Sequence, residues 1–383
     1  MKAKIFIYDE FSPQDNAMLQ ALYSRSPLSV EEHVKKVCQS GSGKFMERFY
    51  VGYGHSSIAD CGSTTLFIEG ISILADKAIQ DWPLYSGQET STRYIDMSQQ
   101  KIIDPIKTEE SGKILSFWMD FYISSQPIMA KHLKKKYPKK EGEDNLVYEK
   151  AIKARTFDIL RSFLPAGITT QLSWHTNLRQ AWDKISWMRH HPLEEVREIS
   201  EEMWRKLKER YPSSFSHELI SEQEEYRKYI MNKYNYLVGK NSVDFSFSTT
   251  IQKNQLEKYN DIFQKRPEKI GLPPFLGELG TFTFNFLLDF GSFRDIQRHR
   301  NGICRMPLLT VNNGFNQWYL EQLPENLKEK ALQLIKEQKE RINNLNASKE
   351  VLQYYIPLGF NVVCRVSYNL PAAIYVAELR SNK

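Results

Sequence analysis

One pattern occurs twice in the chain, and this repetition most constrains how the chain folds. Pro165 precedes Asn177 by 12 positions, and Pro357 precedes Asn369 by the same 12 positions. In both places a long, charged helical pattern leads to the proline, and a second helical pattern begins at the asparagine. The pattern favours an internal duplication with diverged copies. The alternative is a coincidental similarity of two α+β segments.

Both copies end their second helical pattern on an arginine, Arg189 in the first half and Arg380 in the second. A chain of 383 residues is larger than one typical domain, so two domains are expected. We therefore predict an α+β protein with two related domains, residues 1–220 and 221–383. Each is expected to be a β-sheet packed with long helices.

Composition excludes several classes of protein. The net charge is +6, a modest basic bias that is too weak to indicate nucleic acid, so nucleic acid is not an expected partner. The four cysteines lie far apart and form neither a disulfide framework nor a zinc signature, so no metal is expected and a reducing cytoplasm is the simplest setting. The N-terminus is too short and polar for a signal peptide, and no apolar run approaches the ~20 residues that cross a bilayer.

A cationic triplet, Arg298-His299-Arg300, follows an aromatic run in the second half. Guanidinium groups recognise phosphate and carboxylate in a planar, bidentate geometry, and they stack on flat rings. Unpaired charges are also costly to bury. The triplet is therefore either a solvated basic patch or one side of a clamp for an anionic, aromatic ligand such as a nucleotide.

A second polar segment runs from Ser86 to Tyr94 in the first half. In an extended segment alternate side chains share a face, so Glu89, Ser91 and Arg93 are expected to project together. An acceptor, a hydroxyl and a guanidinium can grip a phosphate and a polar ring edge. The alternative is an ordinary Thr/Ser-rich strand with an incidental ion pair.

A third group of polar residues lies on the helical pattern before Pro165. Arg155, Asp158 and Arg161 follow i, i+3, i+6 spacing and therefore lie near one face of that helix. The spacing fits a surface ladder of ion pairs as well as it fits a ligand site.

These residues resemble the flavin-dependent thymidylate synthase family, whose signature runs RHR, then Ser, then ExSxRY in one short segment. Here the signature is split between the halves. The second half has Arg298-His299-Arg300 without ExSxRY, and the first half has Ser86 and 89–94 but Asp81-Trp82-Pro83 where RHR is expected. Each half has thus kept one side of a shared site.

The resemblance implies site residues. Family members carry an activating arginine on the terminal helix, a role that falls on Arg380 or Arg189. Asp295 stands where the family usually has glutamine. The other implied residues bind substrate (Glu89, Ser91, Arg93, Arg161, Asp295, Arg298) or the flavin cofactor (Arg298, His299, Arg300, Ser57, Asn177, Arg179, Glu89, Asn369).

The resemblance also implies an activity. Family members methylate dUMP to dTMP reductively, with methylenetetrahydrofolate as one-carbon donor and NADPH-reduced FAD as hydride donor. Because they are homotetramers, a tandem chain is expected to form a homodimer with composite sites, within one chain or between two. The alternatives are a non-catalytic or regulatory nucleotide- or flavin-binding homologue, and a flavoenzyme acting on another pyrimidine nucleotide.

Overall fold

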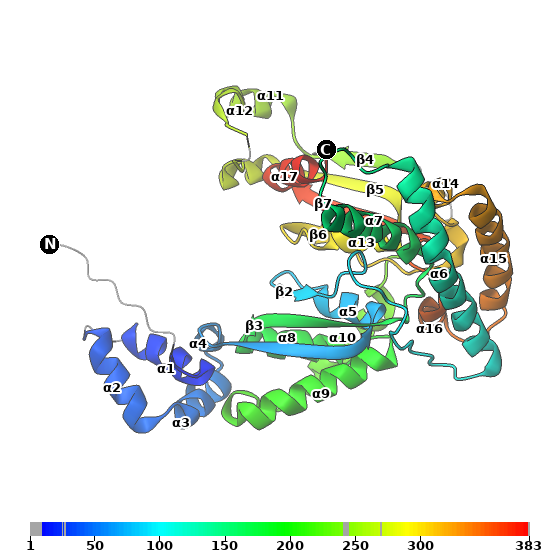
Figure 1. The fold of residues 1–383 in the computed structure, drawn as a ribbon. Coiled ribbons are helices and arrows are strands. Elements are labelled where there is room, and N and C mark those ends of the chain that lie inside the picture. The colour runs from blue at the N-terminus through cyan, green and yellow to red at the C-terminus, as the bar shows by residue number, and fades with distance from the viewer. Residues whose placement is uncertain (1–9, 25, 27, 240–244, 269, 382–383) are drawn as a thin grey trace. The chain divides into compact units, whose positions relative to one another are not determined.

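The computed structural model describes residues 10–24, 26, 28–239, 245–268 and 270–381, and its architecture is α+β (Figure 1). The described chain forms two compact units. Unit 1 contains the residues up to Glu69, together with Ala78–Glu89 and Gln171–Asn235. Unit 2 contains Gly70–Lys77, Thr90–Thr170 and the chain from Tyr236 onward.

Unit 1 is built on a three-stranded sheet with strand order β1-β3-β2. β2 pairs antiparallel with β3, with Ser86 opposite His175 and Glu89 opposite Leu172. The elements that lie wholly or largely in this unit are α1 (Pro13–Tyr23), α2 (Val30–Ser40), α3 (Gly43–Phe45), the π-helix η1 (Met46–Gly52), α4 (Ser56–Ala59), β1 (Ser63–Ser72), β2 (Ser86–Glu89), β3 (Thr169–Asn177), α8 (Leu178–Met188), α9 (Glu194–Arg210), η3 (Pro212–Ser214) and α10 (Ser221–Tyr234).

Unit 2 is built on a four-stranded antiparallel sheet with strand order β4-β5-β7-β6. α5 (Ile73–Gln80) begins in this unit and ends in unit 1. The other elements of unit 2 are α6 (Glu109–Lys136), α7 (Asn145–Leu160), η2 (Arg161–Phe163), β4 (Ser246–Thr249), α11 (Lys253–Glu257), α12 (Asn260–Lys265), η4 (Pro274–Leu279), β5 (Thr281–Asp289), α13 (Phe290–Gln297), β6 (Gly302–Cys304), η5 (Val311–Asn313), α14 (Gln317–Gln322), α15 (Glu325–Asn343), α16 (Lys349–Leu352), η6 (Gln353–Tyr355), β7 (Asn361–Asn369) and α17 (Leu370–Ser381).

Among the helices of unit 2, α7 and α13 begin where their sequences provide a capping side chain. The Asp144 carboxylate accepts from the backbone N–H of Val147 at the start of α7. The Asp289 carboxylate does the same for Ser292 at the start of α13, at 2.7 Å. Such caps satisfy N–H groups that have no partner within the helix. They fix the start of each helix, and through it the position of Asp158 on α7 and Asp295 on α13.

Several elements of the two predicted halves share a common spacing along the chain. η2, β3 and α8 begin at 161, 169 and 178, and η6, β7 and α17 begin at 353, 361 and 370, so each pair is 192 positions apart. The strand order β1-β3-β2 also corresponds to β5-β7-β6. Within unit 2, Pro165 lies opposite Pro357 in an antiparallel bridge. Leu358 N–H donates to Leu164 O at 3.0 Å beside it.

The compact units do not follow the predicted halves 1–220 and 221–383. Residues 90–170 belong to the predicted first half, yet they pack in the same unit as β5, β7 and α13. The segment that follows β2 and the helix α7 therefore share one compact unit with the cationic triplet at 298–300.

Candidate functional site

The end of α13 presents the cationic triplet. α13 buries Phe290 and Phe293, and the chain leaves the helix at Arg298, its C-cap. Cations are favoured at this end of a helix because the helix dipole places partial negative charge there. The guanidinium of Arg298 lies 3.9 Å from the Asp295 carboxylate and keeps 46% of its side chain exposed. The triplet is thus attached to a buried helix and remains partly open to solvent.

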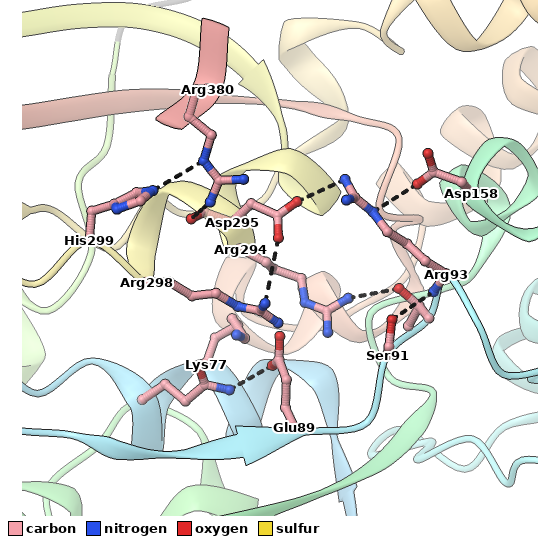
Figure 2. Close-up of polar contacts among 12 residues, drawn as sticks. Lys77, Glu89, Ser91, Arg93, Asp158, Arg294, Asp295, Arg298, His299 and Arg380 are labelled. Atoms are coloured by element: carbon pink, nitrogen blue, oxygen red, sulfur yellow. Dashed lines mark hydrogen bonds and ion pairs between the residues drawn. The ribbon is translucent and has the colours of Figure 1, made fainter. Parts of the chain in front are cut away.

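Arg93 lies between two carboxylates, as Figure 2 shows. Its Nε is 3.0 Å from Asp158 Oδ1, and its Nη2 donates to Asp295 Oδ2 at 3.0 Å. Asp158 comes from α7 of the predicted first half, and Asp295 comes from α13 of the second. Side chains of both halves therefore meet within one compact unit of a single chain.

Arg161 shares one of these carboxylates. Its Nε lies 3.2 Å from the same Asp158 oxygen that contacts Arg93. Burial opposes the charge of Arg161, but Tyr319 and Asp158 outweigh it and raise the pKa of the guanidinium. Arg93, Asp158 and Arg161 thus form a continuous ionic group rather than a ladder along the surface.

Arg380 approaches the triplet from α17. Its Nη2 donates to the backbone oxygen of Asp295 at 2.8 Å, and its Nε donates to His299 Nε2 at 3.1 Å (Figure 2). Burial lowers the pKa of His299, and the nearby Arg380 lowers it further. The imidazole is therefore neutral at pH 7 and accepts this hydrogen bond through Nε2, which places its own proton on Nδ1.

The segment after β2 departs from the sequence prediction. β2 ends at Glu89, and Arg93 lies in a turn in which Tyr94 N–H donates to Ser91 O. The expectation that Glu89, Ser91 and Arg93 share one face of an extended segment is therefore wrong. A turn holds Arg93 instead, because Ser91 Oγ accepts from its backbone N–H at 3.3 Å and Thr92 Oγ1 accepts from Arg294 at 3.3 Å.

The other implied residue of unit 2 is Asn369, which begins α17. Its side-chain oxygen accepts from Ala372 N–H at 3.0 Å. In unit 1, Asn177 caps α8 in the same way and accepts from Gln180 N–H at 2.8 Å. Both asparagines therefore act as helix caps, which is a structural role that asparagine fills well.

The remaining implied residues lie in unit 1. Ser57 is exposed in α4. Glu89 accepts from Gln80 Nε2 at 2.6 Å, and Arg179 donates to Asp60 at 2.7 Å. These contacts lie within unit 1 and involve no ligand. The binding roles that the resemblance implies for these residues therefore stay predictions.

Arg189 has structural partners of its own in unit 1. Its side chain is 7% exposed, its Nε lies 3.0 Å from Glu201, and its guanidinium carbon lies 5.0 Å from the centre of the Trp204 ring. The same guanidinium carbon lies 5.6 Å from the centre of the Trp182 ring. A cation held by a carboxylate and two indole rings stabilises packing. Of the two arginines that the resemblance left open, Arg380 is therefore the better candidate for the activating role.

Sequence reasoning left the role of one residue of these groups open and missed two others. The i, i+3 spacing of Asp158 to Arg161 fitted both a surface ladder of ion pairs and a ligand site, and the two side chains do form an ion pair. Thr92 and Arg294 were not singled out, and only tertiary packing brings them together.

Among the described residues there is no group of three or more His, Cys, Asp or Glu side chains that could hold a metal ion. None of the described helices is long and apolar enough to cross a membrane.

Unit 1 also buries a histidine that sets a pH dependence. Burial, with the nearby Lys184 and Arg197, lowers the pKa of His191 to about 3. The unfolded chain takes up this proton near pH 6.5, so protonation favours unfolding below that pH. We expect the free energy of unfolding to fall with a slope of up to about 1.4 kcal/mol per pH unit between pH 6.5 and 3.

Urea unfolding at pH 7, 6 and 5 measures that slope. His191→Gln should flatten it, whereas the same change at the exposed His55 should not. An unchanged slope in His191→Gln would show that other groups dominate the acid sensitivity.

The described chain is an α+β protein whose unit 2 gathers four arginines around Asp158 and Asp295, and sequence comparison identifies the family. Residues 10–213 match the family described as thymidylate synthase complementing protein, to which this chain belongs. A UPF0159 protein of Chlamydia pneumoniae is 25% identical over 88% of this chain and 74% of its own length. A UPF0159 protein of Thermoplasma acidophilum is 22% identical over 96% of this chain and 88% of its own length. The flavin-dependent thymidylate synthase of Clostridium tetani is 24% identical, over 57% of this chain and 86% of its own.

Proposed function

We propose that this chain catalyses the FAD-dependent reductive methylation of dUMP to dTMP, with methylenetetrahydrofolate and NADPH as co-substrates. The observation that carries the proposal is the ion pair between Arg93 and Asp295. It joins the ExSxRY segment of one half to the RHR segment of the other. This contact supports a site in which the two parts of the split signature act together within one chain.

The internal duplication is part of the proposal. It is supported by the common strand order, by the shared spacing of 192 positions, and by the bridge between Pro165 and Pro357. Segments that are equivalent in two copies meet one another when the copies are related by a two-fold axis. One chain then corresponds to two subunits of the family, and we propose that two chains pair as a homodimer.

Each residue of the ionic group has a role in this scheme. Arg93 and Arg161 bind the nucleotide phosphate through charge-assisted hydrogen bonds, and Ser91 assists them. Arg380 stabilises negative charge that develops on the uracil ring, because its exposed guanidinium carries a permanent positive charge. His299 orients Arg380 by accepting from its Nε. A buried thiolate is not needed for these steps.

The residues assigned to the flavin suit an anionic, aromatic group. Arg298 keeps nearly half of its side chain exposed, and the neutral His299 lies edge-on to Tyr375, 6.2 Å between ring centres. Cations and flat rings are the groups that bind a dinucleotide phosphate and its bases. When bound, the flavin supplies the hydride transfer, and the protein supplies binding and electrostatics.

The test is an assay of purified chain supplied with FAD. We expect a yellow protein that oxidises NADPH in a dUMP-dependent manner and forms dTMP from methylenetetrahydrofolate. A colourless protein that cannot be reconstituted with FAD would contradict the proposal. Binding of dUMP without turnover would instead favour a regulatory nucleotide-binding protein. That second function is favoured by one observation, the occupation of Arg93 by internal carboxylates.

A further inference from the structure

Internal carboxylates contact both edges through which the Arg93 guanidinium could bind a phosphate. A guanidinium binds a phosphate in a fork, either through Nε and Nη2 or through the two terminal nitrogens. In this chain Nε lies against Asp158 and Nη2 donates to Asp295, both at 3.0 Å. Each fork of Arg93 therefore includes a nitrogen that an internal carboxylate already engages.

The two carboxylates differ in what holds them. Asp158 lies one turn before Arg161 on the same stretch of chain and contacts it at 3.2 Å, so it remains paired whether or not Arg93 moves. Asp295 is held at its backbone oxygen by Arg380, while its carboxylate reaches Arg93 and lies 3.9 Å from Arg298. Asp295 is thus the carboxylate that an incoming phosphate must displace or lie beside.

We propose that Asp295 sets the charge selectivity of this site by competing with the phosphate of the ligand for Arg93. The inference rests on the proposed function and specifies its substrate class. A carboxylate only accepts hydrogen bonds and repels a phosphate ester, which carries close to two negative charges at pH 7. The site therefore binds a dianionic monophosphate such as dUMP by breaking the Arg93–Asp295 pair, and the strength of that pair lowers the affinity for dUMP.

The experiment compares two ligands that differ only in the phosphate. Binding of dUMP and of deoxyuridine to the full chain is measured by calorimetry for the unchanged protein and for Asp295→Asn, which keeps the shape of the side chain and removes its charge. Asp261→Asn is the matched control, because it makes the same change in net charge at an exposed residue of α12 that pairs only loosely with Lys265 at 3.9 Å.

We expect Asp295→Asn to bind dUMP at least about tenfold more tightly and deoxyuridine within about twofold of the unchanged protein, since only the phosphate senses the lost charge. The control should change neither affinity. An Asp295→Asn chain that binds dUMP equally or less tightly would overturn the proposal. So would a tenfold gain in Asp158→Asn that Asp295→Asn lacks.

Inorganic phosphate separates this inference from the proposed function. Its affinity, followed by phosphorus-31 line width, reports on the anion site without a pyrimidine. If no chain binds either nucleoside or nucleotide, the proposed function fails, and a gain in phosphate affinity in Asp295→Asn still supports the competition. No gain in phosphate affinity overturns it. Should Asp295→Asn fold poorly by thermal melting, Asp295→Gln replaces it, since its longer amide retains a hydrogen-bond acceptor.

Discussion

Mixing Arg93→Ala chains with Arg298→Ala chains is expected to restore no activity. Arg93 and Arg298 both contact Asp295 within one compact unit, so we expect one site to take both residues from the same chain. Every site in the mixture then carries one of the two lesions. Each single change should lower turnover of dUMP by about 10²-fold or more, because it removes a charge-assisted contact at the reacting nucleotide. The measurement is dUMP-dependent NADPH oxidation after the chains have been unfolded and refolded together.

The control for this experiment is Arg205→Ala. Arg205 is an exposed arginine of α9 whose partners, Glu202 and Glu209, are equally exposed, so its loss should leave turnover unchanged. Recovery of activity in the mixture of Arg93→Ala and Arg298→Ala chains would mean that sites form between chains. That result would contradict the pairing seen in unit 2.

Sequence reasoning predicted the elements that local signals determine. Asn177 and Asn369 were both placed at the start of a helix, where they cap α8 and α17. These predictions succeed because a capping side chain and the helix that it begins depend on neighbouring residues. The segment after Glu89 failed for the opposite reason. Its turn is stabilised by the bond between Thr92 and Arg294, a contact over 202 positions that no local pattern contains.

The ionic group could be predicted only in part. Arg93, Arg161, Arg298 and Arg380 were all implied by the family resemblance, and they do lie in one unit. The sequence left open whether the halves meet within a chain, because the distance between two motifs in space does not follow from their distance along the chain. It also did not predict which arginine of the pair Arg189 and Arg380 would be enclosed by tryptophans.

The proposed duplication offers an explanation for a buried lysine of unit 1. α5 and α13 begin at 73 and 290, so Ala78 corresponds to Asp295. In unit 2, Arg380 donates to the backbone oxygen of Asp295. In unit 1, Lys184 Nζ donates to the backbone oxygen of Ala78 at 2.6 Å and to that of Asp81 at 2.9 Å. A cation thus satisfies the corresponding helix-end carbonyl in both units, where unpaired carbonyls would otherwise remain.

The two cations differ in exposure, and this difference separates their roles. Lys184 is 6% exposed, and burial lowers its pKa to about 8, whereas Arg380 is exposed. Lys184 Nζ also lies 5.7 Å from the centre of the Trp82 ring. Counted from the start of α5 and of α13, Trp82 is at the position that His299 has in unit 2. A buried cation that packs against an indole ring is not accessible to a ligand. We therefore regard the Lys184 group as a closed counterpart of the open Arg380 group.

Replacing Lys184 is expected to lower mainly the stability of the protein, whereas replacing Arg380 is expected to lower mainly its turnover. Lys184→Ala should lower the free energy of unfolding by about 2–4 kcal/mol, since it leaves a cavity and two carbonyls without their donor. Lys184→Met keeps the volume of the stem, so the loss that remains in this variant belongs to the hydrogen bonds. Arg380→Ala should change the free energy of unfolding by no more than about 0.5 kcal/mol, as exposed substitutions usually do, yet lower turnover by about 10²–10³-fold.

Urea unfolding and the NADPH assay, run on the same preparations, give both quantities. Stability is best compared at pH 7, where Lys184 is charged in the folded and the unfolded chain because both pKa values lie above that pH. Above about pH 8 the folded chain releases this proton first, so the unchanged protein should gain stability relative to Lys184→Met up to about pH 10.5. If Lys184→Ala were as stable as the unchanged chain, the carbonyls of Ala78 and Asp81 would have other partners, and Lys184 would not be the structural counterpart of Arg380.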